Sequence, residues 1–109
     1  MGFREAKRDF VDALKDGRVS HESRAGQDEK NWILSGRLDL EEAADIVSAT
    51  RGNQASSSPH HLSPDIEVWV LKPTYRGDRW YVKGHLKGDD FQLVELRLLS
   101  FHPSERDQS

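Results

Sequence analysis

Residues 66–101 read IEVWVLKPTYRGDRWYVKGHLKGDDFQLVELRLLSF, and this stretch decides the fold class. Apolar and polar side chains alternate there with a period of two over 66–71, 80–85 and 94–101, which predicts three strands. Turn-forming residues separate the strands, and Pro103 is expected to end the last of them. The stretch therefore predicts a three-stranded antiparallel meander.

Upstream of the strands, apolar side chains recur at helical spacing. Over residues 3–16 they fall on one face of an amphipathic helix, and Gly17 follows as its stop. Another helix is expected over 39–50, where Asp39 suits the N-cap and Glu42 stands three positions later. A run of helices before a run of strands predicts an α+β domain, with N-terminal helices packed on a small antiparallel β-sheet.

Three segments outside these elements are less regular. Residues 18–20 are expected to form a short extended link or an edge strand. Residues 27–35 are expected to form a shorter helix, although the consecutive apolar residues at 32–34 also allow a strand. Residues 52–64, GNQASSSPHHLSP, contain two prolines and three consecutive serines, which predicts a linker.

Length and composition restrict the class of protein. The chain of 109 residues is one domain by size, with a helical half at 3–51 and a sheet half at 65–103. It has no cysteine, which removes disulfides and thiolate metal sites and fits a reducing compartment. The N-terminal MGFREAKRDF lacks the apolar run of a signal peptide, and no apolar run approaches the roughly 18 residues of a membrane span. We therefore expect a cytoplasmic protein without a membrane partner.

The charge is unevenly distributed. The net charge of −3 argues against a generic nucleic-acid binder. Residues 1–52 hold 9 basic and 11 acidic side chains. Residues 72–87 instead hold one acidic side chain and five basic ones, namely Lys72, Arg76, Arg79, Lys83 and Lys87. The positive charge is therefore concentrated in the predicted hairpin.

Aromatic residues interleave with these cations. Tyr75, Trp80 and Tyr81 offer faces on which unpaired bases can stack, and Lys and Arg neutralise phosphates. By alternation Tyr81, Lys83 and His85 share one strand face, which places a phenol, an ammonium and an imidazole in one row. An ordinary solvated sheet edge explains the same composition, because edge strands often carry lysine.

His102 follows the last strand. Simple alternation places it on the same face as Leu96, Leu98 and Ser100, just beyond the core. A histidine changes charge near neutral pH, so it suits general acid–base work. Cleavage of RNA by its own 2′-hydroxyl needs a base, an acid and cationic stabilisation, all of which such side chains supply. A surface histidine without a role is the alternative.

No metal site and no cofactor are expected. His60 and His61 are adjacent in the linker, which is not the spacing of a helical metal-binding pair. The chain contains no GxGxxG or GxxxxGK phosphate loop and no GxSxG motif.

Several short motifs follow one another along the chain, namely DGRV (16–19), LDLEEAADIV (38–47), IEVWVLKP (66–73), YVK (81–83) and LLSFHPS (98–104). In these motifs and in the order of its elements the chain resembles the MqsR-like toxins of bacterial type II toxin–antitoxin systems, small ribonucleases of the RelE-like fold class. The resemblance covers about residues 5 to 104. The resemblance implies an mRNA endonuclease (an mRNA interferase) with a cognate antitoxin protein as its partner.

The resemblance also implies roles for particular residues. Tyr81 and Lys83 match the family's Tyr-x-Lys strand, whose tyrosine is implicated in cleavage. His102 stands where the family has a functional lysine. The family's loop lysine has no counterpart here, and only His60 and His61 are placed to substitute for it.

The resulting hypothesis is a metal-independent endoribonuclease that cleaves single-stranded mRNA. The catalytic candidates are Tyr81, His102, Lys83, His85 and His60, and the RNA-binding candidates are Lys72, Arg76, Arg79, Trp80 and Lys87. The alternative is a non-catalytic protein-binding module that uses the sheet edge and the aromatic hairpin. A binder of double-stranded DNA is disfavoured, because the helical half is acidic and holds no basic recognition helix.

Overall fold

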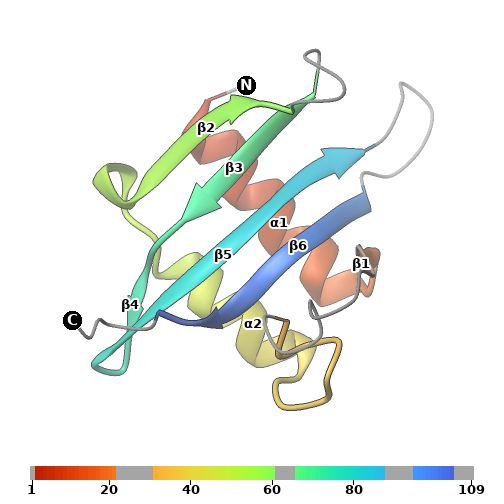
Figure 1. Ribbon diagram of the computed structural model, residues 1–109, viewed down its shortest axis with the longest axis vertical. Coiled ribbons are helices and arrows are strands. Elements are labelled where there is room, and N and C mark those ends of the chain that lie inside the picture. Colours follow the sequence, from red (N-terminus) through yellow and green to blue (C-terminus); the bar gives the residue numbers. More distant parts are fainter. Residues whose placement is uncertain (1, 22–30, 61–65, 88–94, 105–109) are drawn as a thin grey trace.

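Two helices lie on one face of a mixed β-sheet (Figure 1). The computed structural model describes residues 2–21, 31–60, 66–87 and 95–104. The helices are α1 (Phe3–Asp16) and α2 (Leu40–Ser48), with a short 3₁₀ helix, η2 (Gly52–Gln54). The strands are β1 (Val19–His21), β2 (Ala55–Pro59), β3 (Glu67–Leu71), β4 (Thr74–Tyr75), β5 (Asp78–Lys87) and β6 (Glu95–Pro103). The predicted α+β class is confirmed. Within the described residues, no helix combines the length and the apolar character needed to cross a membrane.

The strands follow the order β1–β6–β5–β3–β2, and β4 pairs with the start of β5. β3, β5 and β6 form the predicted antiparallel meander. β1 runs parallel to β6, with Val19 opposite Leu96, so the prediction of an antiparallel sheet is wrong at this edge. The cause is local. Gly17 ends α1 with a φ of 75°, and this left-handed residue turns the chain back to run beside β6.

Both helices follow the sequence pattern. α1 presents Ala6, Phe10, Ala13 and Leu14 to the core. α2 begins after Asp39, whose carboxylate accepts a hydrogen bond from the backbone N–H of Glu42 at 2.8 Å. At the other end of α2, Lys7 Nζ donates to the carbonyl oxygens of Ser48 and Thr50 at 3.2 and 3.1 Å. The two hydrogen bonds join α1 to α2. A positive charge at a helix C-terminus is also favourable.

Residues 31–36 form turns and not the predicted helix, whose first part, 27–30, lies outside the described residues. The sheet accounts for the difference. Asn31 forms an isolated parallel bridge with Phe101, and the Trp32 N–H donates to the Phe101 carbonyl at 2.8 Å. The backbone at Asn31 and Trp32 therefore pairs with β6. This pairing replaces the hydrogen bonds that a helix would form there.

A buried amide connects this segment to β1. The side chain of Asn31 is 2% exposed, and its Oδ1 accepts the Leu34 N–H at 3.1 Å. Its Nδ2 therefore faces His21, 2.9 Å from Nδ1 of the imidazole. Because an amide nitrogen only donates, His21 Nδ1 must accept, and the imidazole is neutral with its proton on Nε2. Burial lowers the pKa of His21, in agreement with this arrangement.

This contact makes the stability depend on pH. In the unfolded chain His21 takes up a proton as the pH falls through about 6.5, whereas in the folded chain its lowered pKa delays protonation. We therefore expect the free energy of unfolding to decrease from pH 7.5 towards pH 5.5, and part of this decrease to disappear in His21→Asn. Urea titrations of both chains at the two pH values measure it. An equal decrease in both chains would contradict the prediction.

The serine-rich segment is a strand and not a linker. Ala55–Pro59 forms β2, an edge strand that pairs antiparallel with β3 from Ala55 opposite Leu71 to Pro59 opposite Glu67. Ser56, Ser57 and Ser58 are exposed, which hid the strand from an argument based on hydrophobic alternation. Backbone hydrogen bonds to β3 fix this segment, and its polar side chains suit an exposed edge.

A β-bulge interrupts the pairing of β6 with β5. Lys83 lies opposite Ser100, whereas the next residue, Gly84, lies opposite Leu98, so Leu99 is the extra residue. Leu98, before the bulge, faces the core. Phe101, after the bulge, also faces the core and is fully buried. The bulge thus reverses the alternation in the second half of β6. The prediction that His102 shares a face with Leu96 and Leu98 is therefore wrong.

Gly84 is required where the two strands approach beside the bulge. A Cβ atom there would lie 2.7 Å from the carbonyl oxygen of Arg97, a backbone atom of β6. Real Cβ contacts essentially never reach this distance. Gly84 therefore allows the local geometry that places Ser100 and His102 away from the helices.

Candidate functional site

One face of the sheet is left uncovered by the two helices (Figure 1). We call this face of β3, β5 and β6 the open face. The strand register places on it Val68, Val70, Arg79, Tyr81, Lys83, His85, Lys87, Arg97, Ser100 and His102. The predicted row of Tyr81, Lys83 and His85 on a single strand face is confirmed by this register.

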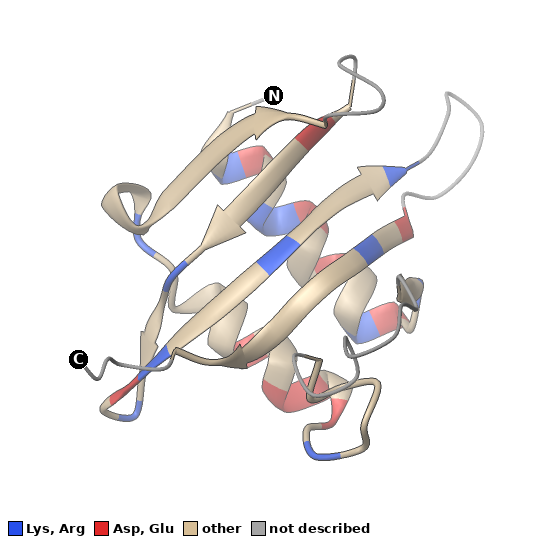
Figure 2. Ribbon diagram, viewed as in Figure 1, with Lys and Arg blue, Asp and Glu red and all other residues tan. Residues whose placement is uncertain are grey.

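The open face is predominantly basic. Figure 2 shows basic positions along β5 and on β6, whereas the helices behind the sheet carry most of the acidic positions. Lys83 lies at the centre, Lys87 at the end of β5 and Arg97 on β6. Among the described residues of these strands, one acidic side chain shares this face, Glu95, which lies opposite Lys87 at the sheet end. Most of the acidic side chains thus lie on the helix side of the sheet, where α1 also carries four basic ones, namely Arg4, Lys7, Arg8 and Lys15.

Tyr81 and His102 lie next to each other on adjacent strands. They are direct register partners, with ring centroids 5.4 Å apart and planes inclined by 34°. Both side chains are half-buried, so each keeps part of its surface open. The His102 Nδ1 lies 2.8 Å from the carbonyl oxygen of Pro103, which can only accept a hydrogen bond. Nδ1 therefore carries a proton, and Nε2 of the neutral ring holds the lone pair of a base.

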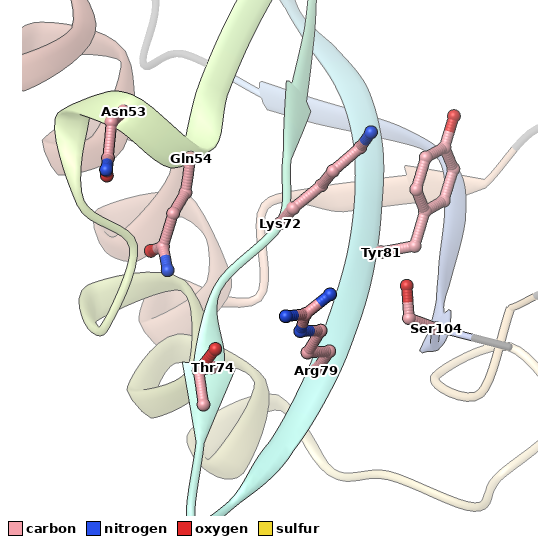
Figure 3. Close-up of a pocket in the computed structure, with 7 residues that line it drawn as sticks. All are labelled: Asn53, Gln54, Lys72, Thr74, Arg79, Tyr81 and Ser104. Atoms are coloured by element: carbon pink, nitrogen blue, oxygen red, sulfur yellow. The ribbon is translucent and has the colours of Figure 1, made fainter. Parts of the chain in front are cut away.

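A pocket of about 470 Å³ opens beside this pair. Its lining comes from η2, the β3–β4 connection, β4, β5 and the residue after β6, as Figure 3 shows. The lining residues are Asn53, Gln54, Lys72, Thr74, Arg79, Tyr81 and Ser104. All seven are polar and none is a carboxylate, so the pocket favours an anion. Tyr81 belongs both to the pocket and to the pair with His102.

The structure separates the predicted site residues into groups. Lys72 and Arg79 line the pocket with Tyr81, and Lys83 lies one step further along the open face. Arg76 lies in the turn after β4, with its guanidinium 5.2 Å from the centroid of the Tyr75 ring. That turn has positive φ at Arg76 and at Gly77, as a two-residue hairpin turn requires. Arg76 and Lys87 therefore mark opposite ends of β5.

Trp80 was predicted to bind RNA, but the structure places its side chain in the core. It is 7% exposed and faces the helices, with its ring edge-to-face against Trp32 at 5.6 Å and Phe101 at 5.9 Å. The alternation along β5 puts Trp80 and Tyr81 on opposite faces, so the two rings cannot contact the same ligand. Trp80 is a core residue, and its predicted role in stacking on bases is wrong.

His60 and His85 form a separate pair. Their ring centroids are 5.6 Å apart, and His85 is only 6% exposed. His85 lies four residue steps along β5 from Tyr81, about 13 Å at roughly 3.3 Å per step. Burial argues against His85, and distance against both imidazoles, acting at Tyr81. Within the described residues, no three His, Cys, Asp or Glu side chains are grouped to hold a metal ion.

Sequence reasoning missed four residues of the pocket, namely Asn53, Gln54, Thr74 and Ser104. They come from three separate segments, and no local motif connects them. Strand pairing brings them together, since the Lys72 N–H donates to the Gln54 carbonyl and the Ser104 N–H to the Arg79 carbonyl. Only tertiary hydrogen bonds of this kind identify the set.

Comparisons of the chain with protein-family models, with curated proteins and with solved structures each find no match. The resemblance to the MqsR-like toxins therefore stays a prediction, and the functional argument depends on the open face and its pocket.

Proposed function

We propose that this chain is a toxin-type endoribonuclease that cleaves single-stranded RNA on its open face without a metal ion. The observation that carries the proposal is the Tyr81–His102 pair, set among basic side chains and beside a pocket without carboxylates. The proposal extends to messenger RNA as the substrate, a cognate antitoxin as the partner and the cytoplasm as the location, as the family resemblance implies.

The cations and the aromatic ring suit an extended single strand. Arg79, Tyr81 and Lys83 alternate along one face of β5, at intervals of about 6.8 Å. Phosphates bind the cations and an unpaired base stacks on the Tyr81 ring, which is the usual way in which proteins hold single-stranded nucleic acid. Bases inside a duplex are stacked on each other and offer no free face to the ring.

The chemistry proceeds by attack of the 2′-hydroxyl on the adjacent phosphorus. His102 Nε2 removes the proton from this hydroxyl as the new O–P bond forms. The bond from phosphorus to the 5′ oxygen breaks, and the Tyr81 hydroxyl gives its proton to that leaving oxygen. Lys83 stabilises the negative charge that develops on the phosphorane. Solvent then returns the proton from His102 to Tyr81, which leaves a 2′,3′-cyclic phosphate and a 5′-hydroxyl end.

The test is incubation of the purified chain with a mixed-sequence single-stranded RNA of about 20 nucleotides in the presence of a chelator. We expect cleavage products with cyclic phosphate ends, and no cleavage of the same sequence with 2′-deoxyribose, because the nucleophile is then absent. Affinity for the uncleaved deoxy strand should decrease steeply as salt rises. Intact RNA after prolonged incubation would overturn the proposal.

The second candidate function is a protein-binding module, favoured by the edge strand β2. Its outer edge has no strand partner among the described residues, and its serines are exposed. An extended segment of a partner protein adds to such an edge through backbone hydrogen bonds. Binding of this kind should respond weakly to salt, so the salt dependence separates the two candidates.

A further inference from the structure

The pocket beside Tyr81 carries positive charge that the described residues leave uncompensated. Lys72 and Arg79 are exposed at its wall, and neither forms an ion pair within the described part of the chain. Figure 3 shows both side chains extending over the pocket from neighbouring segments. Two cations that line the same pocket both attract an anion placed within it. Their arrangement therefore points to an anionic ligand.

The opposite wall adds a donor with a fixed orientation. The backbone N–H of Arg51 donates to Gln54 Oε1 at 2.8 Å. This contact occupies the carbonyl oxygen of the side chain and leaves the NH₂ group of Gln54 available to donate. Thr74 and Ser104 contribute hydroxyl groups to the same lining. The pocket thus combines two cations, an amide donor and hydroxyl groups, which together match the acceptor oxygens of a phosphate.

The pocket is placed for a phosphate next to the one that is cleaved. Tyr81 lines the pocket and also contacts His102, so the two sites share one side chain. Arg79 precedes Tyr81 by two residues on the same face of β5, a separation of about 6.8 Å. An extended single strand advances more than the roughly 3.4 Å per nucleotide of a stacked strand. One nucleotide step therefore connects the pair to the pocket.

We propose that the pocket of Lys72, Arg79 and Gln54 is a subsite for a second phosphate of the RNA, one nucleotide from the bond that is cleaved. This inference rests on the proposed function, since it places the pocket relative to the cleaved bond. It adds that the smallest efficient substrate is a dinucleotide with one extra phosphate and not the dinucleotide alone.

The first experiment compares kcat/KM for three dinucleotides, unphosphorylated, 5′-phosphorylated and 3′-phosphorylated. We expect one of the two phosphorylated forms to be cleaved at least about tenfold faster, the effect of one charge-assisted phosphate contact. In Lys72→Gln and Arg79→Gln this advantage should disappear. Arg4→Gln is the matched control, because Arg4 is exposed on α1 and its loss removes the same charge elsewhere.

The second experiment measures binding and needs no cleavage. The same three dinucleotides with 2′-deoxyribose compete against a fluorescent single-stranded DNA for the protein. We expect the favoured phosphorylated form to bind about tenfold more tightly than the unphosphorylated one, and Arg79→Gln to abolish the difference.

Cleavage and binding together show whether the proposed function or the proposed subsite is wrong. Phosphate-dependent binding without any RNA cleavage would overturn the proposed function and the position of the subsite next to a cleaved bond, while the pocket would remain a phosphate-binding site. Cleavage that is indifferent to the terminal phosphate would leave the function standing and overturn the subsite. An equal loss of phosphate preference in Arg4→Gln would also overturn the subsite, since the effect would then come from net charge.

Discussion

Replacing His102 with alanine is expected to lower the rate of RNA cleavage by about 10²–10⁴-fold, the usual contribution of a positioned general base. The physical reason is the Nδ1 contact with the Pro103 carbonyl, which holds the ring and leaves Nε2 to accept a proton. Tyr81→Phe should cause a loss of similar kind, because it keeps the ring and removes the hydroxyl. Single-turnover kinetics on one labelled RNA measure both effects.

Two controls accompany this prediction. His60→Ala should retain cleavage, because His60 contacts His85, about 13 Å along the sheet from Tyr81. Thermal unfolding of His102→Ala should stay close to that of the unaltered chain, since the His102 side chain is only half-buried. Full cleavage in both His102→Ala and Tyr81→Phe would show that these residues do not perform the proton transfers.

Phe101→Ala is expected to destabilise the fold by about 3–5 kcal/mol, as large-to-small changes of buried aromatic residues do. Phe101 is fully buried, and its ring packs edge-to-face against Trp80 at 5.9 Å. Small domains have only about 5–15 kcal/mol of stability, so the loss is a large fraction of the total. Urea unfolding followed by circular dichroism measures the difference.

The same experiment tests the bulge. Regular alternation from Leu96 would place Phe101 on the open face, where truncation costs little. Leu99→Ala is the matched comparison, because Leu99 is the half-buried extra residue and should cost only about 1 kcal/mol. Phe101→Leu keeps most of the volume and should cost less than about 1.5 kcal/mol, so it remains measurable if the alanine variant does not fold. Equal costs at Phe101 and Leu99 would contradict the register described here.

The local elements were largely predictable because their causes are local. α1 coincides with its predicted range, and α2 starts after the predicted Asp39 cap. Caps, helical periodicity and the left-handed Gly17 all depend on residues within one or two turns. The row on β5 was predictable for the same reason, since β5 itself contains no extra residue. Residues 31–36 and β2 were predicted wrongly, because backbone pairing with distant strands fixes them.

The sequence pattern was enough to predict that helices precede a meander, that the positive charge gathers near β5, and that Tyr81, Lys83 and His85 share a face. The tertiary fold set which face of β5 meets the helices, and therefore that Trp80 is a core residue. It also decided that His102 lies beside Tyr81, because the bulge at Leu99 shifts the register by one residue and reverses every later side chain. The pocket depends on three segments that meet only after the sheet has formed. Contacts between distant segments produce no periodic pattern in a sequence. The site could therefore be recognised only in the folded structure.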